Sequence, residues 1–467
     1  MFNLNKKKKQ MNISKSKGSN GFREEYCSTV VKIGEIFPIE GKDRIVKTLV
    51  NGLSIVIGKN DFTTGDLAIY VSNECVIHEL FLHLNSMFDD KTLNKDTEKR
   101  GYINKHGRVR CVKLGGIPSY GILLTPESIA TFLNEPVEDV VKYLEKHVGE
   151  DFDEINGERF VHVYVPPVKE NNHVSKGDKR NAKLKRFNML LEGSFRLHYD
   201  TKNLNREIKQ FNPDDVIYVS NKLHGTSAIF SNILTNVPTN WIKRMWRKYI
   251  SHTNEYNQKY NLIYSSRTVI KNQFINPKQK IGGYYGDDVW GYWAKKLNGL
   301  VPKDYAIYCE IVGYTPNGSP IQKGYDYGCK PKESKLMVYR ITVNGKELEI
   351  PEVIKFGEEL FDKLGDEIIQ FPIFYQGTMK ELYPDVDVKN HWHENVLELM
   401  KNEKRWGMEE MEIMCNNKVP REGVVIRKAN DPVSEAFKLK CFKFFEKERN
   451  MMDNGEVDIE MEESYIE

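Results

Sequence analysis

Short β-type runs follow one another from about Tyr26, and they restrict the first third of this chain to small folds rich in strands. The clearest pair is IVKTLV and LSIVIG, which are joined by Asn51-Gly52. This dipeptide between two β-rich runs is a strong hairpin signal, because the favoured two-residue turn needs positive φ at both positions. The runs DLAIYV, RVRCVKL and GILL repeat the pattern at short spacing. The sequence therefore predicts a compact module of short strands.

One stretch of this region is helical in character, PESIATFLNEPVEDVVKYLEKHV, and the region ends in FVHVYVPP. Five or so short strands at this spacing suggest a small closed barrel, because closure removes the exposed sheet edges. An OB-like barrel over 24–165 is one economical solution. A β module of another kind is the open alternative.

Composition divides the rest of the chain into a linker, a second domain and two terminal segments. A chain of 467 residues suggests two to three domains of about 100–200 residues each. The basic stretch VKENNHVSKGDKRNAKLKR predicts an interdomain linker over 166–189, with a phosphate-contacting segment as the alternative. Residues 190–450 mix strands with helices and form the second domain. We expect a flexible basic arm over 1–23 and a disordered acidic tail over 451–467.

The overall composition excludes several classes of protein. The chain holds 69 Lys and Arg against 66 Asp and Glu, a net charge of +3, so it is no histone-like polycation, although a local basic face stays possible. The sequence holds no apolar run near the roughly 18 residues that a membrane span needs, so we expect no membrane partner. Seven widely spaced cysteines without C-x-x-C favour free thiols in a reducing compartment, and we expect a cytoplasmic protein, or one of the host cytoplasm if phage-encoded.

The segment with the strongest chemical signal is DDVIYVSNKLHGTSAIFSN. A β-rich run leads into Lys222, glycine follows at Gly225, and a second apolar run begins. A lysine at a strand end can occupy a dry pocket where neighbouring cations and desolvation lower its pKa, which makes the amine a nucleophile. A lone lysine near a glycine is ordinarily a solvent-exposed side chain with no chemical role. No G-x-x-x-x-G-K-[ST] occurs, which disfavours a P-loop.

Four further segments strengthen the case for Lys222. The run LIYSSRT is a strand that ends at Arg267. The run YAIYCEIVG places Glu310 inside an otherwise apolar strand, where a carboxylate is costly unless it is bonded. In REGVVIR a glutamate, Glu422, precedes a buried-looking strand. In AFKLKCF the strand period puts Lys438 and Lys440 on one face. Taken singly, each also fits an ordinary surface position.

In this order, the segments resemble the motifs of the covalent nucleotidyltransferase superfamily, which contains polynucleotide ligases and mRNA capping enzymes. His224, in K-L-H-G, stands where DNA ligases and capping enzymes usually carry aspartate, and in this it looks like the RNA ligases, closest to the nick-sealing phage and RNA-editing types. The segments FRLHYDT and GYTPNGSPIQKGYDYGC resemble sequences of the phage-encoded branch of the RNA ligases. The segments PIEGKDRI, FTTGDLAIYV and VKLGGIPSYGILL resemble the OB-like module of one RNA ligase subgroup.

The resemblance implies an α+β fold, in which a nucleotidyltransferase domain with antiparallel sheets follows the OB-like barrel. It also implies four catalytic residues. Lys222 would attack the α-phosphorus of ATP and form a lysyl-AMP, while Lys438 and Lys440 would neutralise the α-phosphate. Glu422 would help to hold Mg²⁺, with Mn²⁺ as a substitute, because oxygen ligands and phosphate suit such ions. Cationic neighbours would depress the pKa of Lys222.

The resemblance further implies a set of nucleotide-binding positions: Asn221, His224, Gly225, Arg267, Glu310 and Tyr339. Arg267 would contact the ribose or the RNA 5′-phosphate, and Glu310 would hold the ribose hydroxyls. Tyr339 in KLMVYRI would stack on adenine. Two positions depart from the family pattern. Asn221 stands where these ligases commonly have glutamate, and Arg340 stands where nick-sealing ligases have aspartate. Met337, or an aromatic residue from elsewhere in the chain, is therefore an alternative stacking partner.

Two other segments carry less specific signals. The run WIKRMWRKY interleaves aromatic and basic residues, which suits nucleic-acid contact by Lys243 and Arg244. An ordinary amphipathic helix explains the same spacing equally well. His391 and His393 could share the face of a strand and bind a metal, although surface histidines are the simpler interpretation.

The sequence thus predicts an ATP-dependent RNA ligase that joins RNA 3′-hydroxyl and 5′-phosphate ends, and that acts as a monomer. Whether the ends belong to a nicked duplex or to single strands stays open. The alternatives are a capping-type guanylyltransferase or a DNA ligase on the same scaffold, and a non-catalytic RNA-binding relative.

Overall fold

The structure is a computed structural model, and it divides into two compact units, Met1–Pro167 and Val168–Glu467. The residues that it describes are 11–17, 21–165, 189–237, 257–272, 288–389, 391–429, 431 and 435–454. Most of the predicted linker and most of the predicted tail lie outside these residues, so those assignments stay predictions. The predicted flexible arm is wrong over its described part, because the apolar Met11 side chain is buried in the core of the first unit and Ile13–Ser14 pair as a strand with Ile155 and Glu154.

The first unit consists of short antiparallel strands. The strands of its largest sheet, in the order β10-β6-β2-β11, are Ile122–Leu124, Leu67–Val71, Ser28–Lys32 and Asp151–Phe152. The sheet β3-β4-β5 comprises Ile36–Ile39, Lys42–Val50 and Leu53–Gly58. The remaining strands are β8 (Cys111–Leu114) with β9 (Ile117–Tyr120), β7 (Cys75–Ile77) with β14 (Val161–Val163), and β1 (Ile13–Ser14) with β12 (Glu154–Ile155) and β13 (Glu158–Arg159).

These small sheets enclose shared cores, as a barrel requires. Strand β5 contacts both β9 and β10, and one core combines residues from β4, β5, β6 and β10. The predicted hairpin is present between β4 and β5. Its turn residues Asn51 and Gly52 have φ of 48° and 68°, the left-handed values that an Asn-Gly turn supplies at little strain.

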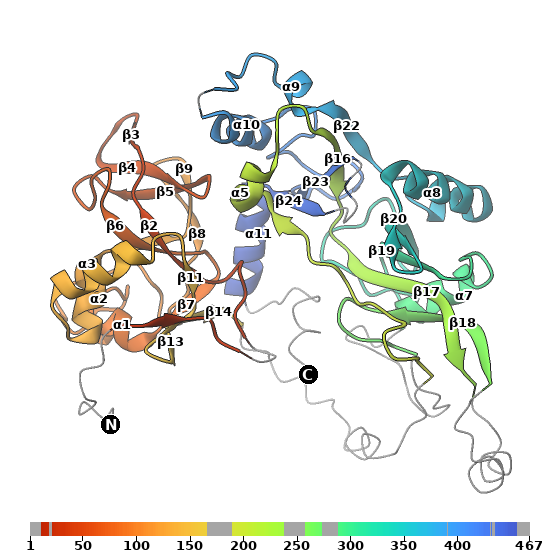
Figure 1. Cartoon of the computed structure of the whole chain (residues 1–467), viewed down its shortest axis with the longest axis horizontal. Helices are drawn as coiled ribbons and strands as arrows, with labels where there is room; N and C mark the ends of the chain where they lie inside the picture. The colour runs from red at the N-terminus through yellow and green to blue at the C-terminus, as the bar shows by residue number, and fades with distance from the viewer. Residues whose placement is uncertain are drawn as a thin grey trace, which may run out of the picture. The chain divides into compact units, whose positions relative to one another are not determined.

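The predicted helical text of the first unit forms two helices, α2 (Pro126–Leu133) and α3 (Val137–Lys146). The Thr125 hydroxyl accepts from the backbone N–H of Ser128 and caps α2, which ends at Asn134 in the left-handed conformation. A third helix, α1 (Glu79–Leu84), precedes them. Figure 1 shows the three helices gathered at one end of this unit. They cover a second apolar core made with β2, β6 and β7.

The second unit is built on two five-stranded sheets. The first, in the order β15-β24-β23-β16-β22, comprises Lys202–Asn203, Ala436–Lys440, Gly423–Lys428, Val216–Lys222 and Ile373–Thr378. The second, in the order β18-β17-β19-β20-β21, comprises Gln258–Ser265, Thr226–Asn236, Tyr305–Gly313, Ser334–Val343 and Lys346–Glu347. Every pairing is antiparallel except that of β15 with β24. Strand β16 passes into β17 at residues 223–225, so the Lys222 segment connects the two sheets.

Helices pack against both sheets. Helices α7 (Val289–Leu297) and α8 (Ile350–Leu364) pack on the second sheet, as Figure 1 shows, and share an apolar core with it. The other helices are α5 (Leu204–Glu207), α9 (Met379–Leu382), α10 (Trp392–Lys401) and α11 (Phe442–Asp453), and short 3₁₀ turns occur at Lys91–Leu93, Ile208–Gln210 and Gly365–Glu367. The largest core joins the first sheet to α5, α9 and α10. The predicted α+β class with antiparallel sheets is confirmed.

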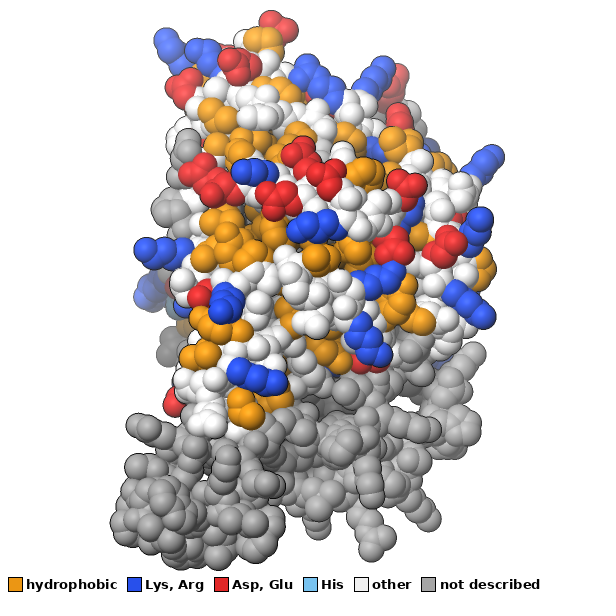
Figure 2. Space-filling view, turned by 90° about the vertical axis from the view of Figure 1, so that its right-hand side faces the viewer, with side chains coloured by type: hydrophobic (Ala, Val, Ile, Leu, Met, Phe, Trp, Pro, Cys, Tyr) orange, Lys and Arg blue, Asp and Glu red, His pale blue; other side chains and the backbone are white. Residues whose placement is uncertain are grey.

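Surface and cysteine chemistry agree with the composition. On the face of the molecule in Figure 2, Lys and Arg side chains are interspersed with Asp and Glu among apolar groups. In the described parts of the chain, no helix is long and apolar enough to cross a membrane. All seven cysteines lie in the described part of the chain, and six of them are buried.

Candidate active site

The predicted nucleophile, Lys222, is the last residue of β16, next to the central strand of its sheet. Across the sheet, Lys222 pairs with Gly423 of β23, and Gly423 pairs with Lys440 of β24. Side chains of directly paired residues project from the same face of a sheet. The register therefore places the two lysines on either side of Gly423, which contributes no side chain of its own.

The carboxylate of Glu422 lies between these two lysines. Its Oε1 is 2.8 Å from the Nζ of Lys222 and 3.3 Å from the Nζ of Lys440. The Glu422 side chain is only 4% exposed, whereas those of Lys222 and Lys440 keep 24% and 22%. The cluster thus has two partly exposed ammonium groups above one buried carboxylate, and the Nζ of Lys440 also lies 3.3 Å from Oε1 of Glu448.

The charges in this cluster shift the pKa of Lys222 in the direction opposite to the one predicted from the sequence. Burial is the largest single influence on the pKa of Lys222 and lowers it, as does repulsion by Lys440. The attraction to Glu422 and Glu310 and the hydrogen bond to Glu422 together outweigh both, so the pKa of Lys222 is raised. Burial raises the pKa of Glu422, but Lys222 and Lys440 outweigh it and hold that pKa well below its usual range. The prediction of a depressed pKa for Lys222 is therefore wrong for this state of the site, because it left out the carboxylate.

The K-L-H-G turn is fixed by contacts with the second sheet. The N–H of Gly225 donates to Oε1 of Glu310 on β19 at 2.9 Å, which gives this strand carboxylate the bond that its position requires. A Cβ on Gly225 would lie 2.3 Å from the backbone oxygen of Ile311, so only glycine fits. Here the close approach is to a neighbouring strand of the protein itself.

His224 lies beside Glu422 on the same turn. Its Nδ1 is 3.6 Å from Oε2 of Glu422, and its backbone N–H donates to the hydroxyl of Tyr327 at 2.7 Å. The rings of Tyr325 and Phe444 contact the imidazole edge to face, at 4.7 and 4.9 Å between ring centroids. His224 therefore helps to position Glu422 and the turn.

Lys438 and Arg267 lie around a second carboxylate, which the sequence did not identify. A guanidinium nitrogen of Arg267 is 2.5 Å from Oδ1 of Asp200, and Lys438 also acts electrostatically on Asp200. His198 lies 4.0 Å from the same oxygen, and burial together with Arg267 lowers the pKa of His198 to about 3. Asp200 and His198 belong to FRLHYDT, which the resemblance singled out without giving them roles.

The predicted adenine-stacking residue, Tyr339, lies on β20 and is partly buried against the largest core. Its ring is tilted against that of His198 at 6.3 Å between centroids, and its backbone oxygen accepts from Arg427 at 2.7 Å. Arg340 pairs with Glu347. The alternative, Met337, is buried and pairs directly with Glu310 across the sheet. The stacking role stays a prediction for both residues.

Asn221, the residue before the nucleophile, bonds to an acid that sequence reasoning missed. Its Nδ2 donates to Oε2 of Glu412 at 3.0 Å, and both side chains are buried. Glu412 lies in MEEMEIM, where acids and apolar residues intermingle and nothing distinguishes one acid from its neighbours. Only the fold brings it to the nucleophile strand.

Of the weaker candidates, only the two histidines lie within the described residues. Lys243 and Arg244 lie outside the described residues. His391 and His393 lie at the start of α10, so the assumed strand is wrong, and His393 bonds to the backbone oxygen of Phe211 at 2.9 Å. No cluster of three or more His, Cys, Asp or Glu suited to a metal occurs within the described ranges.

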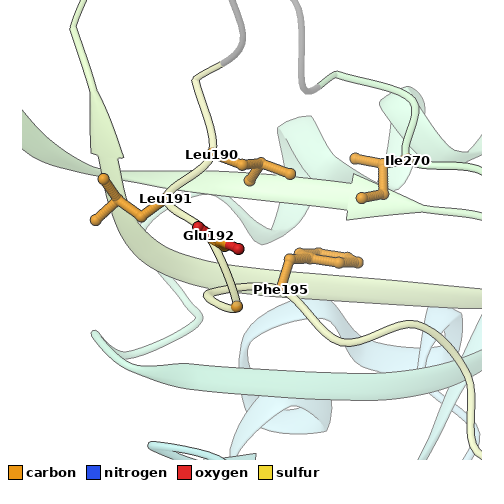
Figure 3. Close-up of a pocket in the computed structure, with 6 residues that line it drawn as sticks. Leu190, Leu191, Glu192, Phe195 and Ile270 are labelled. Carbon is orange, nitrogen blue, oxygen red and sulfur yellow. The ribbon is translucent and has the colours of Figure 1, made fainter.

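A hollow of about 360 Å³ lies at the N-terminal segment of the second unit, and none of the site residues discussed above lines it. Figure 3 shows Leu190, Leu191, Phe195 and Ile270 around it, with Glu192 beside them. Its described lining holds one carboxylate and no Lys or Arg, so it offers no charge complementary to a phosphate.

Comparisons with known proteins find matches for both units. Residues 215–444 match the RNA ligase family, and residues 27–126 match an OB-fold domain. No curated protein matches the chain. The fold resembles that of the Naegleria gruberi RNA ligase solved with pyrophosphate, at 18% identity and a TM-score of 0.52, covering 92% of this chain and 100% of that one. The structure of a variant of that ligase with AMP and Mn is similar at 17% identity and a TM-score of 0.51. The match covers 91% of this chain and 99% of that one.

The family match spans the functional cluster from Asn221 to Lys440, and the OB-fold match coincides with the strand-rich first unit. The resemblance inferred from motif order is thereby confirmed. Residues 215–444 of this chain belong to the RNA ligase family, and an OB-fold domain precedes them.

Proposed function

We propose that this RNA ligase is ATP-dependent and works through a lysyl-AMP on Lys222. The observation that carries the proposal is the row Lys222, Gly423 and Lys440 with the Glu422 carboxylate bridging the two amines. Attack at a phosphate requires a nucleophile and positive charge near the phosphate oxygens. Here an amine can serve as the nucleophile, a second amine supplies the charge, and a buried carboxylate lies beside both. The N. gruberi ligase, whose structures include one with ATP and Mn, supports the choice of ATP.

The reaction has three displacements at phosphorus. The neutral amine of Lys222 attacks the α-phosphorus of ATP, so that a P–N bond forms and the bond to pyrophosphate breaks. An oxygen of the RNA 5′-phosphate then attacks the same phosphorus and releases the lysine, which gives an adenylylated RNA end. Finally the RNA 3′-hydroxyl attacks the 5′-phosphorus and expels AMP. Lys440 and Lys438 would offset the charge that builds on the phosphate oxygens.

In this scheme Glu422 interacts with Lys222 at one stage and with a divalent metal ion at another. While it pairs with Lys222, the amine holds its proton and cannot attack. The single buried carboxylate suits Mg²⁺ or Mn²⁺, which commonly take one or two protein carboxylates and complete their shell with phosphate oxygens and water. When bound, such an ion supplies positive charge that stabilises the leaving pyrophosphate. Engagement of Glu422 elsewhere frees the Lys222 amine to lose its proton.

Charges around the site support contact with RNA ends. Arg267 pairs with Asp200, on which Lys438 also acts electrostatically, and in this scheme Arg267 would meet the RNA 5′-phosphate. We further propose that nicked duplexes are among the substrates, that the protein acts as a monomer, and that it works in a reducing compartment such as the cytoplasm.

Transfer of label from α-labelled ATP to the protein tests the proposal. Wild-type protein is expected to take up AMP, seen also as a mass increase, and Lys222→Ala is expected to take up none. Lys209→Ala, at an exposed lysine of the preceding 3₁₀ turn, serves as the control. Label that persists in Lys222→Ala would sink the assignment.

The same assay separates the rival functions. Labelling by GTP in place of ATP would favour a capping-type enzyme. Sealing of all-DNA nicks in preference to RNA would favour a DNA ligase. A comparison of nicked duplexes with single-stranded RNA ends decides the substrate class, and absence of both labelling and sealing would leave a non-catalytic RNA-binding relative.

A further inference from the structure

The side-chain amide of Asn221 is buried with only one of its two ends bonded. Asn221 is 3% exposed and adjoins the nucleophile. Its Nδ2 donates to Oε2 of Glu412 at 3.0 Å and lies 3.7 Å from Sδ of Met414. Its Oδ1 has no hydrogen-bond partner among the described residues. A buried acceptor that is left unbonded is unfavourable, so this oxygen is suited to meeting a donor on a ligand.

The Glu412 carboxylate that holds the amide is itself firmly held. Glu412 is 2% exposed, its Oε1 accepts from the backbone N–H of Met414 at 3.1 Å, and its Oε2 lies 3.5 Å from Nε of Arg421. Arg421 is buried and donates to the backbone oxygen of Trp406. The backbone N–H of Glu412 donates to the oxygen of Val419 at 2.8 Å, which closes the loop that carries it. The carboxylate therefore has a fixed position.

A carboxylate next to an amide determines which way the amide faces. An ionised carboxylate only accepts hydrogen bonds, so the NH₂ group of Asn221 must point to Glu412. Turning the amide over would bring Oδ1 against the carboxylate, where two acceptors repel each other. The arrangement thus holds Oδ1 as an acceptor on the side away from Glu412.

We propose that Glu412 is a positioning residue that sets the choice of nucleotide in the first step. By locking the Asn221 amide, it keeps an acceptor directed at the base, which favours a base with an amino group at position 6. Adenine carries an amino donor at position 6, whereas guanine carries a carbonyl acceptor there. A freely rotating amide would serve either base. This inference rests on the proposed adenylylation of Lys222.

The test compares ATP with GTP as label donors for wild-type protein and two variants of Glu412. Glu412→Gln carries an amide that can donate to Oδ1 of Asn221, so the Asn221 amide can turn over. Glu412→Asp keeps the charge opposite Arg421 but is one methylene too short to hold the amide. Both are expected to lower the ratio of ATP to GTP labelling about tenfold or more, as loss of one buried hydrogen bond implies.

Glu410→Gln, an exposed acid on the same loop, is the matched control and should leave the ratio unchanged. Because Glu412 acts through Asn221, Glu412→Asp should have no further effect on the ratio in an Asn221→Ala background. Thermal melting shows which variants are folded, and Glu412→Asp carries the test if Glu412→Gln is not.

The outcomes separate the inference from the function on which it rests. If wild-type protein is labelled by ATP and the folded Glu412 variants keep the wild-type ratio, the inference is wrong and the ligase proposal stands. A loss of labelling by both nucleotides in equal measure likewise contradicts it. If wild-type protein takes label from neither nucleotide, the proposed function itself fails.

Discussion

At the scale of single residues, the site is governed by one carboxylate shared between two amines. Glu422 is 4% exposed and lies within 3.3 Å of both Lys222 and Lys440. A buried carboxylate of this kind persists only because its charge is matched, and removing a partner would leave an uncompensated charge. The pair therefore keeps the nucleophile protonated until another ligand engages Glu422.

The protonation state of Lys222 predicts a pH dependence for the first step. The ion pair raises the pKa of Lys222, and only the neutral amine attacks, so the reactive fraction grows as pH rises toward that pKa. Single-turnover labelling by ATP is expected to rise by close to tenfold per pH unit over about pH 6 to 8. Sealing of RNA that is already adenylylated does not need a free amine and serves as the control. A labelling rate independent of pH in this range would contradict the argument.

Motif order identified several of these residues before the structure was known, and the reason is local. Lys222, Gly225 and Glu310 lie at fixed places within strands or turns, so the neighbouring sequence predicts their positions. Glu412 and Asp200 have no such local signal. Their partners, Asn221 and Arg267, are distant in sequence, so only folding pairs them.

At the scale of elements, the antiparallel register of β16, β23 and β24 sets the spacing of the catalytic groups. Gly423 occupies the position between the two lysines, with φ of 148°. A Cβ there would lie 2.1 Å from the backbone oxygen of Leu439. Glycine is thus required at this point both for the backbone and for close packing of β24.

Substitution of Gly423 tests this account of the sheet. Gly423→Ala is expected to lower the free energy of unfolding by roughly 2–4 kcal/mol, because β24 must move away from β23. Displacement of Lys440 with that strand should also reduce labelling by ATP. Thermal or denaturant unfolding, read together with the labelling assay, measures both effects.

Gly357 of α8 provides the matched control. A Cβ at this helical position meets nothing within 4 Å. Gly357→Ala is therefore expected to raise stability by about 0.5–1 kcal/mol without changing the labelling. If Gly423→Ala proves as harmless as Gly357→Ala, glycine is not needed between the lysines.

At the scale of the whole molecule, a net charge of +3 conceals a local arrangement of charge. Acidic and basic groups are mixed on the face in Figure 2, whereas lysines and an arginine gather around Glu422 and Asp200 in the site. A near-neutral total therefore gives no measure of affinity for RNA.

Salt should separate binding of RNA from the reaction with ATP. Contacts with RNA phosphates release counterions, so the apparent affinity in the sealing step is expected to fall roughly tenfold or more between about 50 and 200 mM salt. Labelling by ATP at saturating concentration should change much less. Sealing that is equally insensitive to salt would argue against binding through phosphates at this cluster.

The sequence by itself determined the strand-rich first unit, most of the element types and the order of the ligase-like motifs. These features depend on neighbours along the chain: the period of a strand, an Asn-Gly turn, or a lysine three residues before a glycine. Each was legible because its cause lies within a few residues.

Only the tertiary structure decided which charges meet. It placed Glu422 against Lys222 and so reversed the expected direction of the pKa shift, and it brought Glu412 to Asn221. Such pairings depend on sheet register and on loops that return from far along the chain. Coulombic and hydrogen-bond energies change steeply over a few ångströms, and distances of that size across the fold are not encoded in local sequence.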